Sequence, residues 1–104
     1  MFEEKKKYLN LYLLQQQKID RLNKLCEINP EKKEEYLSEI KASVKLRTDI
    51  ENKIKDIDDE LLIELLFQKY VFKKSLDEIA ISLNYSKRHI ERLHNKALER
   101  IDIK

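Results

Sequence analysis

The residues best suited to chemistry lie close together near the C-terminal end of the sequence, and most carry cationic or amide side chains. They are Ser86, Lys87, Arg88, His89, Glu91, Arg92, Asn95 and Lys96. An arginine can donate two hydrogen bonds to guanine, an asparagine can pair with adenine, and a lysine neutralises phosphate charge. We predict that this stretch enters the major groove of duplex DNA. Arg88 and Arg92, with His89 beside them, are expected at the bases, and Lys87 and Lys96 at phosphates.

An amphipathic helix over residues 86–101 would place these side chains on one face. Apolar residues recur between them at helical spacing, which predicts a buried stripe on the opposite face. The stripe consists of Ile90, Leu93, Ala97, Leu98 and, one turn further, Ile101. Ser86 precedes the helix and can cap its first turn.

A shorter helix is predicted just before this one. Residues 75–78 read Ser-Leu-Asp-Glu, the S-x-x-E pattern of a capping box. The apolar positions that follow at helical spacing are Leu76, Ile79, Ala80 and Leu83. Asn84 tolerates the left-handed conformation that ends a helix. Tyr85, in the turn, is expected to fill the gap between the two helices.

Charge is nearly balanced over the whole chain but not along it. The 104 residues include 22 Lys and Arg against 20 Asp and Glu, for a net charge of +2. The chain is therefore not a polycation, and nucleic-acid affinity must come from local charge. A basic helix face is usually only a solvated face. Here the cations are concentrated after Ser86, whereas the helix expected from about Asp58 to Tyr70 carries Asp58, Asp59, Glu60 and Glu64 against Lys69 alone. This contrast favours DNA binding.

The composition predicts an all-α fold, because glycine is absent and Pro30 is the single proline. Residues 3–28 and 31–55 are each expected to form a long amphipathic helix, separated by a break at Pro30. We predict an antiparallel helical hairpin over residues 1–56, followed by a three-helix module over residues 57–104. The module's first helix is expected to begin after Asp58 or Asp59 and to end near Tyr70. Phe72 is either a core residue or an exposed contact, and we favour the core.

The first long helix carries a heptad-like seam. Its members are Tyr8, Tyr12, Gln15, Ile19, Leu22 and Cys26, widened by Leu11, Leu14 and Leu25. The second helix is expected to bury Leu37, Ile40, Val44, Leu46, Ile50 and Ile54. A single cysteine cannot form an internal disulfide, so we expect Cys26 to be buried in a cytoplasmic protein. No membrane span is expected.

Residues 57–101 resemble the fourth conserved region of bacterial sigma factors and the helix-turn-helix proteins built like it. The matching positions are Leu65-Leu66 with Tyr70, then Ser75 to Ala80, then Ser86, Ile90, Leu93 and Ala97-Leu98. Within that group, residues 85–94 look most like the small phage-encoded ArpU-like and RinA-like transcription regulators. The resemblance implies a transcription regulator of phage or prophage origin, with Ser86 and Lys96 where phosphate contacts are usual.

Two positions depart from the family pattern. The family usually has glycine where this chain has Lys73, so the loop before residue 75 is expected to be shaped differently. The family also commonly has glycine in the turn that Asn84 occupies. Asparagine is the best substitute for glycine there, so we expect the turn to be preserved.

Metal binding and catalysis are not expected. His89 and His94 are five residues apart and diverge by roughly 140° around a helix, so they cannot share an ion. Glu91 and His94 have the spacing of di-metal bundles, but those sites need the motif twice. His94 is instead predicted to be a boundary residue or a phosphate partner. No catalytic motif or cofactor signature is present, which argues against an enzyme.

Two functions remain open. In the first, the chain is a sequence-specific DNA-binding transcriptional regulator, and its hairpin forms a homodimer or contacts RNA polymerase. In the second, the chain is a helical adaptor whose hairpin binds RNA polymerase or a sigma factor without contacting DNA. The first rests on the basic helix face and the second on the length of the heptad-bearing part.

Overall fold

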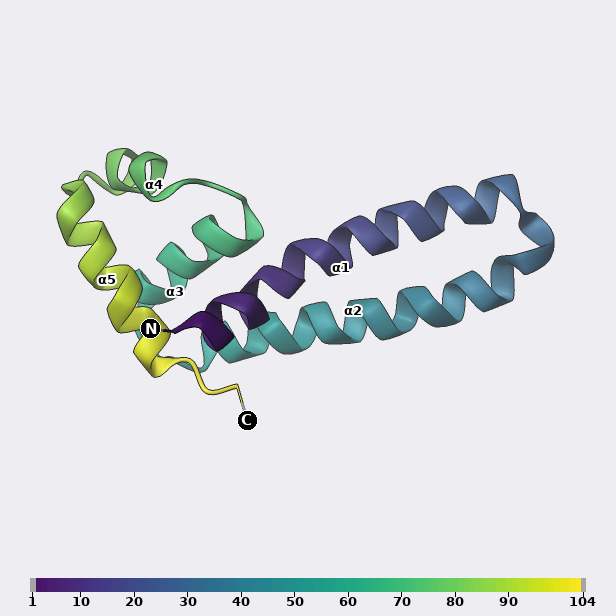
Figure 1. Cartoon of the computed structure of the whole chain (residues 1–104), viewed down its shortest axis with the longest axis horizontal. Helices are drawn as coiled ribbons and strands as arrows, with labels where there is room; N and C mark the ends of the chain where they lie inside the picture. The colour runs from purple at the N-terminus through teal and green to yellow at the C-terminus, as the bar shows by residue number, and fades with distance from the viewer. Residues whose placement is uncertain (1, 104) are drawn as a thin grey trace.

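A computed structural model describes residues 2–103, and all regular secondary structure in this range is helical (Figure 1). The long helices are α1 (Glu3–Ile28) and α2 (Lys33–Lys55), with a short 3-10 turn, η1 (Pro30–Lys32), between them. The remaining elements are α3 (Glu60–Leu66), a π-helical segment η2 (Phe67–Val71), α4 (Leu76–Leu83) and α5 (Lys87–Arg100). The predicted all-α class is confirmed. In the range described, no helix combines the length and the apolar character needed to cross a bilayer.

Helices α1 and α2 lie side by side and run in opposite directions (Figure 1). Pro30 ends the first helix because it lacks a backbone donor, and it starts the short 3-10 turn. The buried positions on α1 are Leu9, Tyr12, Ile19 and Leu22, and those on α2 are Ser43, Ile50 and Ile54. The Tyr12 hydroxyl donates a hydrogen bond of 3.3 Å to Glu51, which ties the helices together across their contact.

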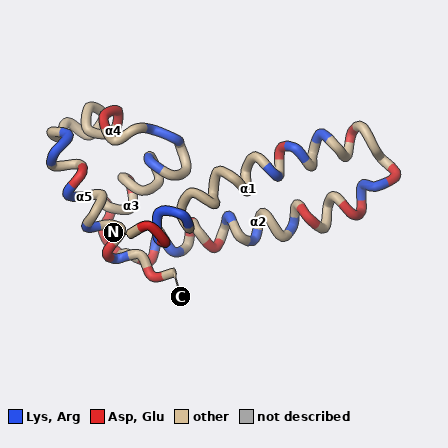
Figure 2. Tube along the Cα trace, viewed as in Figure 1, with Lys and Arg blue, Asp and Glu red and all other residues tan. Residues whose placement is uncertain are grey.

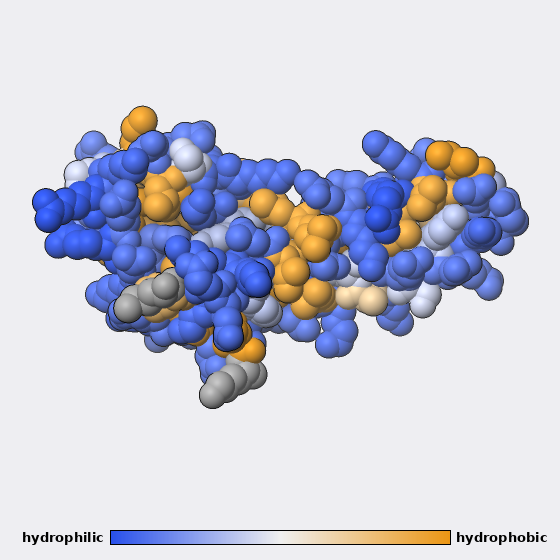
Figure 3. All heavy atoms as spheres, viewed as in Figure 1, coloured by the Kyte–Doolittle hydropathy of each residue, from blue (hydrophilic) through white to orange (hydrophobic). Residues whose placement is uncertain are grey.

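The half of the α1–α2 pair distant from the other helices buries less than its pattern suggested. Leu14 is 55% exposed and Leu37 is 46% exposed, and Cys26 is only partly buried. Each helix has a single partner here, so only a narrow stripe is covered and the flanking positions stay in solvent. The prediction that Leu14 and Leu37 are buried was wrong for this reason. Figure 3 shows apolar surface along α1 and near the far end of the pair.

One hydrophobic core extends from the near half of the α1–α2 pair into the C-terminal helices. It includes Leu9 and Tyr12 of α1, Ile50 and Ile54 of α2, and the buried residues of α3 to α5. The far half of the pair projects beyond this core (Figure 1). The chain therefore measures 52 × 29 × 23 Å, with a radius of gyration of 16.2 Å, against about 13 Å for a compact domain of this length.

The segment between α3 and α4 is where the structure departs most from the prediction of a regular α-helix that ends near Tyr70. Asp59, one of the two residues expected to cap this helix, accepts a hydrogen bond of 3.2 Å from the Leu62 amide. Helix α3 then widens into the π turn of η2, whose last bond joins the Phe72 amide to the Phe67 carbonyl. Tyr70 points into the core, but Phe72 follows the end of the turn and is 62% exposed. The prediction that Phe72 is a core residue was wrong.

Candidate nucleic-acid interface

Side-chain caps set the ends of α4 and α5. The Ser75 hydroxyl accepts from the Glu78 amide at 3.1 Å, and the Glu78 carboxylate accepts from the Ser75 amide at 3.2 Å. Asn84 ends α4 with φ 61°, in the left-handed region. The Ser86 hydroxyl accepts from the His89 amide at 3.1 Å and so starts α5. The predicted capping box, turn residue and second cap are confirmed.

Lys73 also takes a left-handed conformation, with φ 62°. Only glycine adopts this region without a steric cost, and the cost for other residues is roughly 1–2 kcal/mol. Lys73 therefore adopts a backbone conformation that glycine would adopt without strain, and the loop before α4 carries this steric cost.

The apolar side of α5 packs against α3 and α4. Its buried residues are Ile90, His94, Ala97 and Leu98, and Ile101 beyond the helix is buried too. At 100° per residue, Arg88 and Arg92 lie roughly 135° and 175° around the helix from the centre of this stripe. Packing thus fixes α5 with both guanidinium groups directed to solvent.

The residues predicted to bind DNA come together at the surface of α5 and its cap. Ser86, Lys87, Arg88, Glu91, Arg92, Asn95 and Lys96 are exposed, and His89 is partly buried. Figure 2 shows cationic residues along α5, with acidic positions among them. The surface is therefore a mixed one with a cationic excess, formed by a single helix.

Two successive side-chain contacts on the exposed face position Arg92. The rings of Tyr85 and His89 lie 4.8 Å apart, and Arg92 Nη2 lies 2.9 Å from His89 Nδ1. Because a guanidinium group only donates, Nδ1 accepts this bond and the ring proton lies on Nε2. Tyr85 is 41% exposed and packs on His89. The prediction that Tyr85 fills the gap between α4 and α5 was wrong.

Lys87 forms an ion pair with Asp77 of α4, with 3.1 Å between Nζ and Oδ1. Both side chains are more than half exposed. Exposed pairs contribute only about 0–1 kcal/mol. Lys87 can therefore exchange Asp77 for a phosphate at little cost.

His94 is not available to a phosphate, contrary to one of its predicted roles. The residue is 6% exposed, and Nε2 shares a hydrogen bond of 2.8 Å with the Tyr70 hydroxyl. Burial, with the positive charges of Lys69 and Lys6, lowers the pKa of His94 to about 4. Burial also raises the pKa of Tyr70 to about 12. His94 follows Ile90 by four residues, so helical spacing alone places it in the buried stripe.

Within residues 2–103, no group of three or more His, Cys, Asp and Glu side chains is placed to hold a metal ion. Comparison of the chain with protein-family models, curated proteins and solved structures gives no significant match.

Proposed function

We propose that α4, the turn at Asn84 and α5 form a helix-turn-helix, and that the chain is a sequence-specific DNA-binding transcriptional regulator. The observation that carries this proposal is the placement of Arg88 and Arg92. Both face solvent from a helix whose opposite side is anchored in the core. A rigid helix presenting arginines is what direct reading of the major groove requires.

The proposed roles follow from position on α5. Arg88 and Arg92 contact base edges, with His89 Nε2 offering a further donor beside them. Each bidentate arginine contact discriminates by about 1–3 kcal/mol. Among the flanking residues, Ser86, Lys87 and Lys96 hold phosphates, while Glu91 and Asn95 lie at the edge of the contact surface.

The α1–α2 pair acts in this proposal as a hairpin that dimerises the protein or contacts RNA polymerase. A single helix-turn-helix binds weakly, so a partner copy is expected to supply the second half-site. The resemblance of residues 85–94 to the phage-encoded ArpU-like and RinA-like regulators supports a phage or prophage origin, and the proposed role places the protein in the cytoplasm.

A second candidate function is a helical adaptor that binds RNA polymerase or a sigma factor without contacting DNA. The exposed apolar residues Leu14, Ile28 and Leu37 of the α1–α2 pair favour it. Singly exposed apolar residues are common on protein surfaces. The DNA-binding function is therefore the better supported of the two.

Selection of bound sequences from a random duplex pool tests the proposal, followed by a salt titration on the selected site. Enrichment of an inverted repeat is expected, with affinity that falls steeply as salt rises. Arg88→Ala and Arg92→Ala should each weaken specific binding by about 5- to 150-fold. Arg21→Ala, an exposed arginine of α1, is the matched control and should leave affinity unchanged.

Failure of enrichment, with retention of RNA polymerase subunits in a nuclease-treated pull-down, would establish the adaptor instead. Unchanged affinity and salt slope in the Arg88→Ala/Arg92→Ala double variant would show that α5 is not the contact surface.

A further inference from the structure

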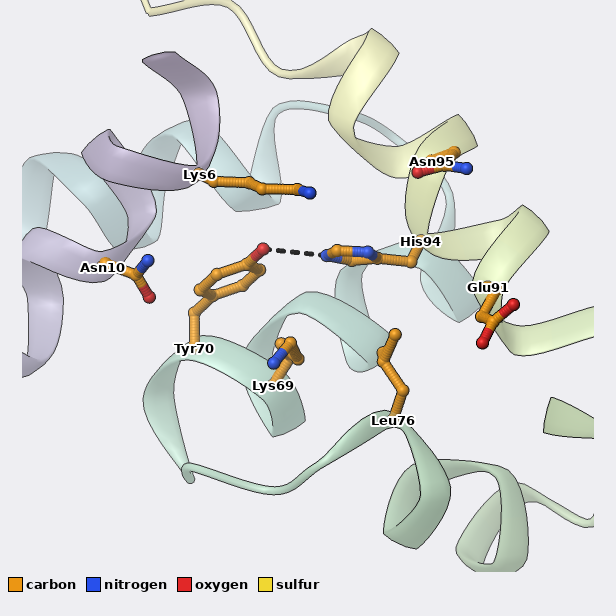
Figure 4. Close-up of a pocket in the computed structure, with 8 residues that line it drawn as sticks. All are labelled: Lys6, Asn10, Lys69, Tyr70, Leu76, Glu91, His94 and Asn95. Carbon is orange, nitrogen blue, oxygen red and sulfur yellow. Dashed lines mark hydrogen bonds between the residues drawn. The ribbon is translucent and has the colours of Figure 1, made fainter. Parts of the chain in front are cut away.

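A cavity of about 470 Å³ lies where α1, η2 and α5 meet, beside the exposed face of α5 (Figure 4). Its polar lining includes Lys6, Asn10, Lys69, Tyr70, His94 and Asn95. Its size is within the range of small-molecule sites, which is about 300–1,000 Å³. The cavity therefore has room for a small ligand, contacted by helices far apart in the sequence.

Positive charge gathers in this cavity. Lys6 and Lys69 are both partly buried, and neither forms a salt bridge with a residue between positions 2 and 103. Both ammonium groups act on His94, whose pKa they lower after the larger effect of burial. Lys69 Nζ also lies 5.7 Å from the centre of the Tyr70 ring, a contact that leaves its charge in place. A bound anion would give both ammonium groups a partner of opposite charge.

The remaining lining is compatible with an anion. Asn10 and Asn95 carry amide groups that can donate from opposite sides of the cavity (Figure 4). Glu91 contributes a carboxylate, but it lies at the edge, away from the Tyr70–His94 hydrogen bond (Figure 4). The two lysines therefore exceed the one carboxylate, and the amides add neutral donors.

We propose that this cavity binds an oxyanion of the phosphate class through Lys6 and Lys69, with Asn10 and Asn95 as further donors. Lysine binds phosphate as a compact point charge and needs no fixed fork geometry. The anion comes either from a free phosphorylated molecule or from a duplex phosphate next to α5. Only the second source rests on the proposed DNA-binding function. A bound anion would link Lys6 of α1 to Asn95 of α5.

The test is a titration of the full chain with sodium pyrophosphate at pH 7, without DNA and at constant ionic strength. His94 ring signals in the NMR spectrum report binding, because a nearby anion changes the field at the imidazole. A saturable shift of the His94 signals is expected. Lys6→Gln and Lys69→Gln should each weaken binding by at least about tenfold. Lys7→Gln, an exposed neighbour, should leave it unchanged.

A shift that does not saturate, or that persists in the Lys6→Gln/Lys69→Gln variant, overturns the site. Repeating the titration with bound duplex identifies the source. Competition between pyrophosphate and duplex, with a salt slope reduced by about 2 in the double variant, assigns the anion to the duplex. Undiminished pyrophosphate binding to the DNA complex assigns it to a free molecule. Pyrophosphate binding without any duplex binding supports the site while the proposed function fails.

Discussion

The protein should lose stability as the pH falls from 7 to 5, because His94 must be neutral in the folded state. Its pKa is about 4 when folded, against 6.5 for an ordinary histidine. The unfolded chain therefore binds the proton first. The stabilisation from neutral His94 is complete above pH 6.5, declines as the pH falls towards 4, and changes no further below that value.

The size of the loss follows from the two pKa values. The difference between a pKa of 6.5 and one of about 4 corresponds to about 3 kcal/mol over the full range. Somewhat less than 2 kcal/mol of this falls between pH 7 and pH 5. The cavity beside His94 admits solvent, which screens the charge, so we expect a loss of about 1–2 kcal/mol in that interval.

Urea unfolding followed by circular dichroism at several pH values measures this loss. Carboxylates titrate over the lower part of the same interval, so the informative quantity is the difference between the wild type and His94→Gln. The variant should show a pH dependence weaker by about 1–2 kcal/mol. Equal pH dependence in the wild type and His94→Gln would refute the assignment of a buried, neutral His94.

Three further predictions concern local structure. Lys73→Gly should raise the free energy of unfolding by about 0.5 kcal/mol, because relief of the left-handed strain exceeds the entropy cost of glycine. Lys73→Ala should not raise the free energy of unfolding, and thermal melts of the two variants test the difference. Asp59→Ala should cost about 1–2 kcal/mol in a urea titration, since it removes the α3 cap and the 3.5 Å ion pair with Arg100. Phe72→Ser should change the free energy of unfolding by less than about 0.5 kcal/mol. Leu66→Ala, in the core, should lower it by about 2–5 kcal/mol. Similar losses in the two variants would contradict the exposed placement of Phe72.

The parts of the fold that depend on neighbouring residues could be predicted from the sequence. Ser75, Asn84 and Ser86 act through backbone groups four residues away or fewer, so their types and spacing were sufficient. The side of α5 that is exposed followed from helical spacing in the same way. His94 had the spacing of a buried residue, but its polar side chain suggested a boundary position.

Features that depend on distant contacts could not be predicted in this way. Leu14 and Leu37 have the spacing of core residues, but their burial depends on how many helices surround the α1–α2 pair. Phe72 is exposed because α3 ends in a π turn, for which the sequence has no local signal. The cavity combines Lys6 with Lys69, and only the packing of α1 against η2 brings them together.

The continuous core has a practical consequence for any attempt to divide the chain. Leu9 and Tyr12 cover apolar side chains that belong to the last half of the sequence. A fragment beginning at residue 57 would expose those side chains to water, and α5 would lose part of its support. Removing the first dozen residues should therefore impair the C-terminal helices, whereas shortening the projecting tip of the helix pair should leave them intact.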